Sequence, residues 1–177
     1  MFLEFLKLEI DSAIRKPMIY IFFFVMALLV FMAVVSDNVV IGGTVGNVYK
    51  NAPYVITNYV AILSIFGLLI AAAFFNTSAL KDYDNNFSEI LFSTPINKAS
   101  YFFGRFFGAL ILATIPLLGV FVGFLLGAEL GPKFDWISAD RIGPFHFTTF
   151  LNNYLLFILP NMFFAGTIIF ALANKFK

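Results

Sequence analysis

The residue types that carry out covalent or metal chemistry are scarce in this chain. It has one histidine, His146, and no cysteine. A zinc site takes three or four histidine, cysteine or carboxylate ligands, and a single histidine does not supply such a set. Ser138, Asp140 and His146 are the residue types of a nucleophilic triad, but nothing in their spacing supports the geometry that a triad requires. The sequence therefore favours an ordinary loop histidine over a catalytic one, and it argues against an enzyme.

The glycine-rich stretch Gly42–Asn47 has the composition of a phosphate-binding loop. It lacks the Gly-Lys-Ser/Thr sequence that holds nucleotide phosphates and magnesium. We therefore expect no cofactor in this chain, and any ATP hydrolysis that drives it must take place on another chain.

Composition identifies the class of protein. Of 177 residues, 61% are hydrophobic and only 12% are charged, and 26 are phenylalanine. Soluble domains contain about 25% charged residues, and one globular core cannot hide this much apolar surface. The sequence therefore predicts an all-α integral membrane protein. The formal net charge of +1 gives no indication of nucleic-acid binding.

Four apolar segments, 18–35, 54–75, 106–128 and 154–173, contain no Asp, Glu, Lys, Arg or His. Each approaches or reaches the length of about 20 residues that spans a bilayer. Backbone groups in hydrocarbon must bond within their own segment, so these spans should be helices. The missing ionisable residues also argue against a proton-coupled or sodium-coupled carrier.

The placement of lysine and arginine predicts the orientation of the spans. One side would carry three of these residues, Lys50, Lys133 and Arg141, and the other side the remaining eight: Lys7, Arg15, Lys16, Lys81, Lys98, Arg105, Lys175 and Lys177. The positive side of a membrane protein faces the cytoplasm. We therefore expect both chain ends and the loop around 76–100 to be cytoplasmic, with 36–53 and 129–153 outside.

The first 17 residues form a separate unit in this interpretation, ahead of a transmembrane domain over 18–177. An amphipathic helix over 2–16 should lie in the headgroup plane before Pro17 turns the chain into the first span. Its apolar face at helical spacing would consist of Phe2, Leu3, Leu6, Ile10, Ala13 and Ile14. A plain anchor and a mechanical role are both open.

Residues 80–95 predict a short helix between the second and third spans. Asn86 would be its N-cap with Glu89 at the third helical position, and Pro95 would end it near Ser93. Two helical turns are unstable alone in water, so such a helix needs a partner surface or the membrane. A solvated connector is the alternative. For docking we expect acidic side chains facing the cytosol and an apolar face, formed by Asp82, Asp84, Phe87, Glu89, Leu91, Ser93 and Pro95.

The third span carries small residues along one side. These are Gly104, Gly108, Gly119, Gly123 and Gly127. Small residues at four-residue spacing let helix backbones approach closely, so this face should pack against another helix of this chain or of a dimer mate. Pro116 and Pro160 should bend their helices, Asn58 and Asn161 could satisfy freed backbone groups or line a path, and Arg105 should reach the headgroups.

The run from Leu80 to Gly108 resembles the cytoplasmic loop and following span of ABC-type export permeases of the type-2 superfamily. The matching residues are Glu89, Leu91, Ser93, Pro95, Lys98, Gly104 and Arg105. Gly42–Asn47, Asn51–Tyr54 and Arg141–Phe145 resemble a narrower bacterial branch, often fused to a zinc-aminopeptidase-like region.

The resemblance implies a division of labour. A separate cytoplasmic ABC ATPase would bind ATP and magnesium, its movement would reach the spans through the loop, and a second permease copy or paralogue would complete the transport route. The location would be the bacterial cytoplasmic membrane. Family members have about six spans, so this four-span chain is expected to be an N-terminal fragment. The alternative function is a non-catalytic scaffold or assembly subunit of a larger membrane complex.

Overall fold

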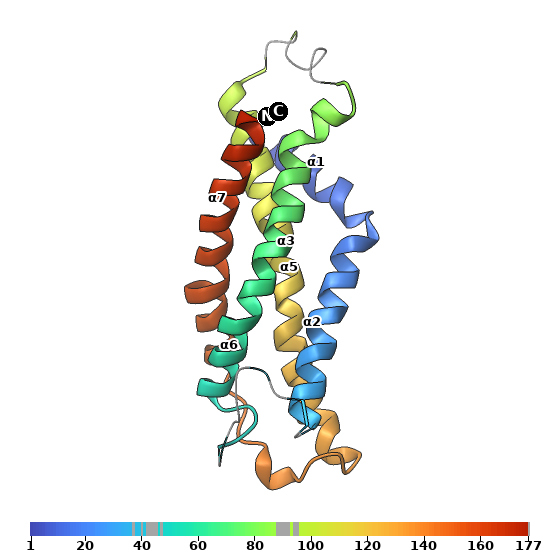
Figure 1. Ribbon diagram of the computed structural model, residues 1–177, viewed down its shortest axis with the longest axis vertical. Helices are drawn as coiled ribbons and strands as arrows, with labels where there is room; N and C mark the ends of the chain where they lie inside the picture. The colour runs from blue at the N-terminus through green and yellow to red at the C-terminus, as the bar shows by residue number, and fades with distance from the viewer. Residues whose placement is uncertain are drawn as a thin grey trace.

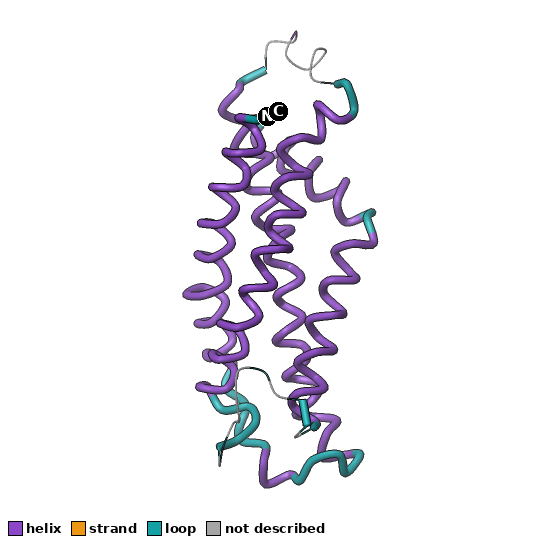
Figure 2. Tube along the Cα trace, viewed as in Figure 1, coloured by secondary structure: helices purple, strands orange, loops and turns teal. Residues whose placement is uncertain are grey.

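The structure is a computed structural model that describes residues 1–36, 38–39, 41, 46, 48–87, 93 and 96–176. Throughout these residues the regular structure is helical and no strand occurs (Figure 2). The elements are α1 (Phe2–Ile14), α2 (Pro17–Val35), α3 (Pro53–Asp84), α5 (Lys98–Lys133), the 3-10 turn η1 (Ala139–Arg141), α6 (Phe147–Asn153), the π-helical turn η2 (Tyr154–Ile158) and α7 (Leu159–Lys175).

Four helical segments of the described chain are long and apolar enough to cross a membrane: α2, α3, α5 and the continuous run Phe147–Lys175. They run alternately up and down, with both chain termini at one end of the bundle, called the terminal end below (Figure 1). The predicted fold class, an N-terminal helix followed by four transmembrane helices in an all-α membrane protein, is confirmed.

Helix α5 is the central element of the bundle. In its most apolar window 67% of the residues are buried inside the protein, against 33% for α2 and 22% for the Phe147–Lys175 run. It packs against α1, α2, α3 and α7. Large side chains from several helices fill the core around it, among them Tyr59, Phe75, Leu117, Phe124 and Met162. Helices α1 and α2 are therefore placed mainly by their contacts with α5, whereas α7 packs mainly against α3.

Glycine residues let two helices approach α5 closely. A Cβ at Gly127 would lie 2.8 Å from the Cβ of Val34 in α2, and one at Gly108 would lie 2.8 Å from the Cβ of Glu9 in α1. Gly119 and Gly123 lie directly against the backbone of α2, so a side chain there would displace it. The glycine side of α5 thus faces α1 near the terminal end and α2 along the rest of its length.

The two longest helices end in the same hydrogen-bonded turn. Asn86 follows α3 with a φ of 54°, and Asp135 follows α5 with a φ of 56°. The Phe87 N–H donates to the Asp82 carbonyl at 2.8 Å, and the Asn86 N–H donates to the Tyr83 carbonyl at 3.0 Å. This is the pattern of a Schellman C-cap, in which asparagine can replace glycine because it tolerates the left-handed conformation. The prediction that Asn86 is an N-cap is therefore wrong, because an N-cap residue needs an extended backbone.

Pro160 lies two residues after the end of the π-helical turn η2. There the Leu159 N–H donates to the Tyr154 carbonyl, five residues earlier. The α-helical ladder is therefore interrupted just before the proline, which has no N–H of its own to donate. Pro116 lies inside α5 without ending it. One side-chain hydrogen bond joins η2 to α5 near these prolines, because the Tyr154 hydroxyl donates to Thr114 Oγ1 at 3.2 Å.

Replacing Gly123 with leucine should separate α2 from α5 and lower stability by about 1–3 kcal/mol or more, because an overpacked contact between backbones cannot relax without moving a helix. The measurement is unfolding of the purified chain in dodecyl maltoside micelles with increasing SDS. The control is Leu126→Gly on the same helix, at a position whose side chain is exposed. An unchanged unfolding midpoint for Gly123→Leu would contradict the close contact.

Candidate functional site

A network of charged side chains is buried at the terminal end of the bundle, where α1, α3 and α5 meet. Its centre is Arg105 of α5, whose side chain is 4% exposed. One guanidinium nitrogen donates to Glu9 Oε2 of α1 at 2.6 Å, and the other donates to Asp82 Oδ2 of α3. A single arginine therefore holds one carboxylate from each of two other helices. Glu9, Asp82 and Arg105 are called the ion triad below.

Two further side chains complete the network. The Tyr101 hydroxyl donates to the same Asp82 oxygen at 2.7 Å, and the Arg105 guanidinium lies over the Tyr101 ring at 5.5 Å. Lys81 lies beside Glu9, with Nζ 3.6 Å from Oε2, and also donates to Ser12 Oγ of α1. Two acidic and two basic side chains thus balance in charge. Arg105 Nε is the one nitrogen of this guanidinium left without a partner among the described residues.

The approach of Glu9 to Arg105 depends on the small residues of α5. With glycine at position 108, nothing separates the α5 backbone from the Glu9 side chain. Gly104, one turn earlier, admits Phe5 in the same way, since a Cβ there would lie 2.7 Å from the Cβ of Phe5. The ion triad and the close packing of α1 on α5 are therefore parts of one contact.

Helix α1 packs against the bundle through much of the apolar face expected from its sequence, together with Phe5 and Glu9. Within the predicted face Ala13 is buried and Phe2, Leu6 and Ile10 are half-buried, whereas Leu3 and Ile14 are exposed. Phe5 meets Tyr101 in an aromatic edge contact at 5.4 Å, and the buried Glu9 bonds to Arg105. The helix is therefore attached to the bundle by a face that carries apolar side chains and one carboxylate.

The buried charged network has members at both ends of the connection between α3 and α5. Asp82 lies two residues before the end of α3, and Tyr101 lies three residues after the start of α5. Both ends of this connection are therefore bonded to each other, and through Arg105 to α1. Ser78 adds a further link, because its hydroxyl donates to the Arg105 carbonyl at 3.2 Å. A displacement of either end would act on all three helices.

Two predictions about these residues are wrong. Asp82 was expected to face the cytosol and meet a partner, but it is buried and bonded to Arg105 and Tyr101. Arg105 was expected to extend to the headgroups, but it is buried between two carboxylates. In a low-dielectric interior a charge is stable only when it is paired and hydrogen-bonded, and the two carboxylates supply that pairing.

Three of the other residues predicted to couple this chain to a partner, Asp84, Phe87 and Ser93, are among the described residues. Asp84 and Phe87 are exposed where α3 ends, and Ser93 is exposed. Glu89, Leu91 and Pro95 lie outside the described residues, as does most of the predicted loop helix. The structure therefore places Asp84 and Phe87 where a partner can reach them and leaves the docking role a prediction.

Sequence reasoning missed Glu9 as a site residue. A signal was present, because Glu9 lies four residues after Phe5 and four before Ala13, within a stripe of otherwise apolar side chains. A carboxylate at such a position on an amphipathic helix indicates a buried partner of opposite charge. Among the described residues, no group of three or more His, Cys, Asp or Glu side chains could hold a metal ion.

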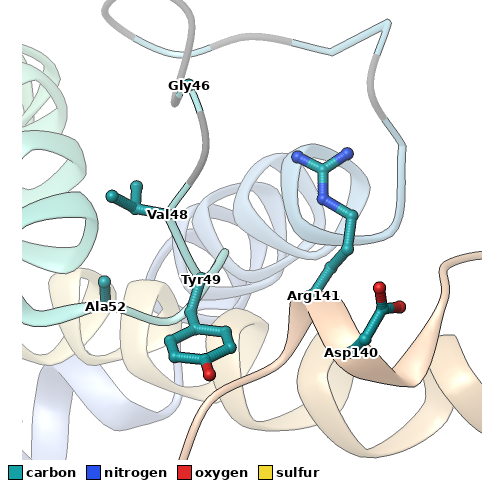
Figure 3. Close-up of a pocket in the computed structure, with 6 residues that line it drawn as sticks. All are labelled: Gly46, Val48, Tyr49, Ala52, Asp140 and Arg141. Carbon is teal, nitrogen blue, oxygen red and sulfur yellow. The ribbon is translucent and has the colours of Figure 1, made fainter.

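A second contact between distant segments lies at the opposite end of the bundle. The Asn51 amide donates to the Gly143 carbonyl at 2.8 Å and accepts from the Gly143 N–H at 2.7 Å. The segments that contain Asn51 and Gly143, far apart in the sequence, are thus bonded to each other. Beside them, Tyr49, Ala52, Asp140 and Arg141 line a cavity of about 570 Å³ (Figure 3). Residues 42–45, which precede the cavity-lining segment in the sequence, lie outside the described residues. We assign no site to this cavity.

Replacing Arg105 with alanine should lower the free energy of unfolding by about 3–5 kcal/mol, because it leaves two carboxylates buried without their partner. Arg105→Lys should lower the free energy of unfolding by less than Arg105→Ala does. A lysine keeps the charge but lacks the planar fork that donates to Glu9 and Asp82 at once. The measurement is again unfolding in mixed micelles. The control is Lys133→Ala on the same helix, where the ion pair with Glu129 is exposed. Equal effects of Arg105→Ala and Lys133→Ala would contradict a buried triad.

Comparison with known proteins agrees with this architecture. No curated protein and no solved structure is significantly similar to the chain. The family profile described as "ABC-2 family transporter protein" matches residues 3–173, which include the ion triad and nearly all of α1 and of the four membrane-spanning segments. The chain therefore belongs to the ABC-2 family of membrane transporter proteins.

Proposed function

We propose that this chain is the permease subunit of an ABC exporter, and that the ion triad couples its helices to a separate cytoplasmic ATPase. The observation that carries this proposal is the bonding of both ends of the α3–α5 connection to α1 through Arg105. In this function the ATPase hydrolyses ATP with magnesium, and this chain has no catalytic role. The terminal end of the bundle faces the cytoplasm of a bacterial cell.

A movement of the α3–α5 connection would be transmitted to the rest of the bundle through the ion triad. Asp82 and Tyr101 share one hydrogen bond, so the last turn of α3 and the first turns of α5 move together. Glu9 extends that unit to α1, which continues into α2 after a break of two residues. Because α2 packs along the glycine side of α5, movement of α1 reaches the full length of the bundle.

The same arrangement would serve a passive scaffold poorly. Buried ion pairs add little to stability compared with apolar packing of the same volume, so a scaffold gains little from one arginine shared between three helices. A transporter subunit whose three helix ends must move together does gain from such a shared arginine. The predicted continuation into an aminopeptidase-like region is a separate matter, which the reading frame after Lys177 tests.

Replacing Glu89 with lysine should weaken association with the ATPase at least tenfold, because it reverses a charge on the loop that we expect to dock. The measurement is co-purification of the ATPase with the permease from native membranes at matched expression. Lys98→Glu, at the start of α5, is a control for charge reversal near the loop. Unchanged association of the Glu89→Lys variant would count against docking through this loop.

Replacing Glu9 with glutamine should leave association intact but lower permease-stimulated ATP hydrolysis at least threefold, because α1 loses its ionic bond to Arg105. The measurement is the ATP hydrolysis rate of the purified complex in lipid vesicles. The matched control is Glu4→Gln on the same helix, because Glu4 is exposed and pairs only with the N-terminal amine among the described residues. If Glu9→Gln hydrolyses ATP like Glu4→Gln, the triad does not couple the two subunits.

A further inference from the structure

The fourth membrane-spanning run, Phe147–Lys175, has one extra residue in the middle of its buried face. Its buried residues are Phe150, Asn153, Ile158, Met162, Gly166 and Phe170. Steps of three or four residues keep side chains on one face of an α-helix. Every step in this series has that size except the one from Asn153 to Ile158, which is five residues. That step spans the π-helical turn η2, where hydrogen bonds join residues five apart. The turn therefore keeps both halves of the span on one buried face.

The two halves are attached to the bundle by different contacts. In α7, Gly166 lies against the ring of Phe75 of α3, and the Phe170 ring meets the same ring edge-on at 6.5 Å. In α6, the Phe150 ring meets the Phe121 ring of α5 edge-on at 5.2 Å. Each half therefore has its own attachment, and η2 lies between them.

Hydrogen-bonding groups are left over at η2. Asn153 Oδ1 is buried without a hydrogen-bond partner among the described residues. The Leu155 carbonyl loses its usual donor, because the Leu159 N–H donates to the Tyr154 carbonyl instead. The next residue, Pro160, has no N–H to offer in its place. Unpaired polar groups in an apolar environment raise the free energy, so this turn opens more easily than the regular helix on either side.

Two side chains near the turn bond to neighbouring helices. The Tyr154 hydroxyl donates to Thr114 Oγ1 of α5 at 3.2 Å, and Thr114 is buried. The Asn161 amide donates to Ser64 Oγ of α3 at 3.5 Å, and it has no other hydrogen bond among the described residues. The Tyr154 bond is the shorter of the two, and it joins the turn to the central helix of the bundle.

We propose that η2 is a hinge of the fourth span, at which α6 pivots against a fixed α7, and that the Tyr154–Thr114 hydrogen bond holds α6 in the described position. Sharp bends in helices occur at prolines and at π-helical turns, and here both lie between Tyr154 and Pro160. When the bond to Thr114 breaks, α6 moves relative to α5, while the contact of Gly166 with Phe75 keeps α7 in place.

The pivot changes the packing at one end of the bundle only. Helix α6 lies at the end opposite to the chain termini, and the ion triad lies at the terminal end (Figure 1). The inference goes beyond the proposed function, because every contact that carries it lies within this chain. It holds or fails independently of an ATPase.

Distances between spin labels, measured by double electron-electron resonance on the chain in lipid vesicles, test the pivot. The chain has no cysteine, so labels attach only at introduced ones. One pair joins Leu151→Cys of α6 to Leu28→Cys of α2, and the reference pair joins Ile168→Cys of α7 to Leu28→Cys. All three side chains are exposed. Tyr154→Phe should raise the population of a second distance in the α6 pair about fivefold, since a hydrogen bond changes an equilibrium by about that factor. The α7 pair should not change. Tyr54→Phe, an exposed tyrosine on α3, is the matched control and should change neither pair.

Hydrogen exchange of the same chain tests whether the turn opens easily. Amides of residues 155–159 should exchange about tenfold faster than those of 163–167 in the same span. Pro160→Ala supplies the missing N–H and should slow exchange at 155–159 about fivefold. The matched control is Pro116→Ala in α5, a helix that its proline does not end, and it should leave exchange at 155–159 unchanged.

Three results would each overturn the hinge: equal exchange along the span, an α6 label pair that does not respond to Tyr154→Phe, or equal changes in both label pairs. In the last case α7 would move together with α6. None of these results bears on association with an ATPase, which the Glu89→Lys variant tests separately.

Discussion

The arrangement of the terminal end depends on one guanidinium. Arg105 is buried between carboxylates from α1 and α3, and neither carboxylate has another arginine among the described residues. A charge in such a place is tolerated only when it is paired and hydrogen-bonded, so the positions of Glu9 and Asp82 are fixed by the need to pair with Arg105. Gly104 and Gly108 of α5 and the path of α1 follow from the same requirement, since α1 must come close enough for Glu9 to reach Arg105.

This requirement joins local structure to function. The connection between α3 and α5 is the part of the terminal end where an ATPase is proposed to act, and both of its ends are bonded to the triad. Three helices that are far apart in the sequence therefore respond as one unit. The opposite end has its own junction between Asn51 and Gly143, so the bundle is held at both ends while the middle relies on close packing and apolar contact.

The fold class was predictable because long segments without charge have one stable form in a bilayer. Glycine spacing also indicated a packing face on the third span, and the structure places α1 and α2 against it. The charged residues were harder to interpret. Arg105 and Asp82 lie near the ends of apolar segments, where arginine and aspartate usually meet water. Their burial depends on α1, whose path along α5 no local pattern in the 76–105 region reveals. Asn86 shows the same limit, because asparagine suits both ends of a helix and only the backbone angle distinguishes them.

The most direct test of the central claim is to replace the ionic bond of α1 with a covalent one. The rings of Phe2 and Phe107 lie 6.3 Å apart between their centroids, outside the triad. In a chain without natural cysteines, a bifunctional thiosulfonate reagent can link Phe2→Cys to Phe107→Cys and so join α1 to α5 through bonds that reduction cleaves. In the Glu9→Gln background, cross-linking should recover most of the permease-stimulated ATP hydrolysis, and reduction should remove it again. Hydrolysis that stays low in the cross-linked protein would contradict the claim that α1 acts through its attachment to α5.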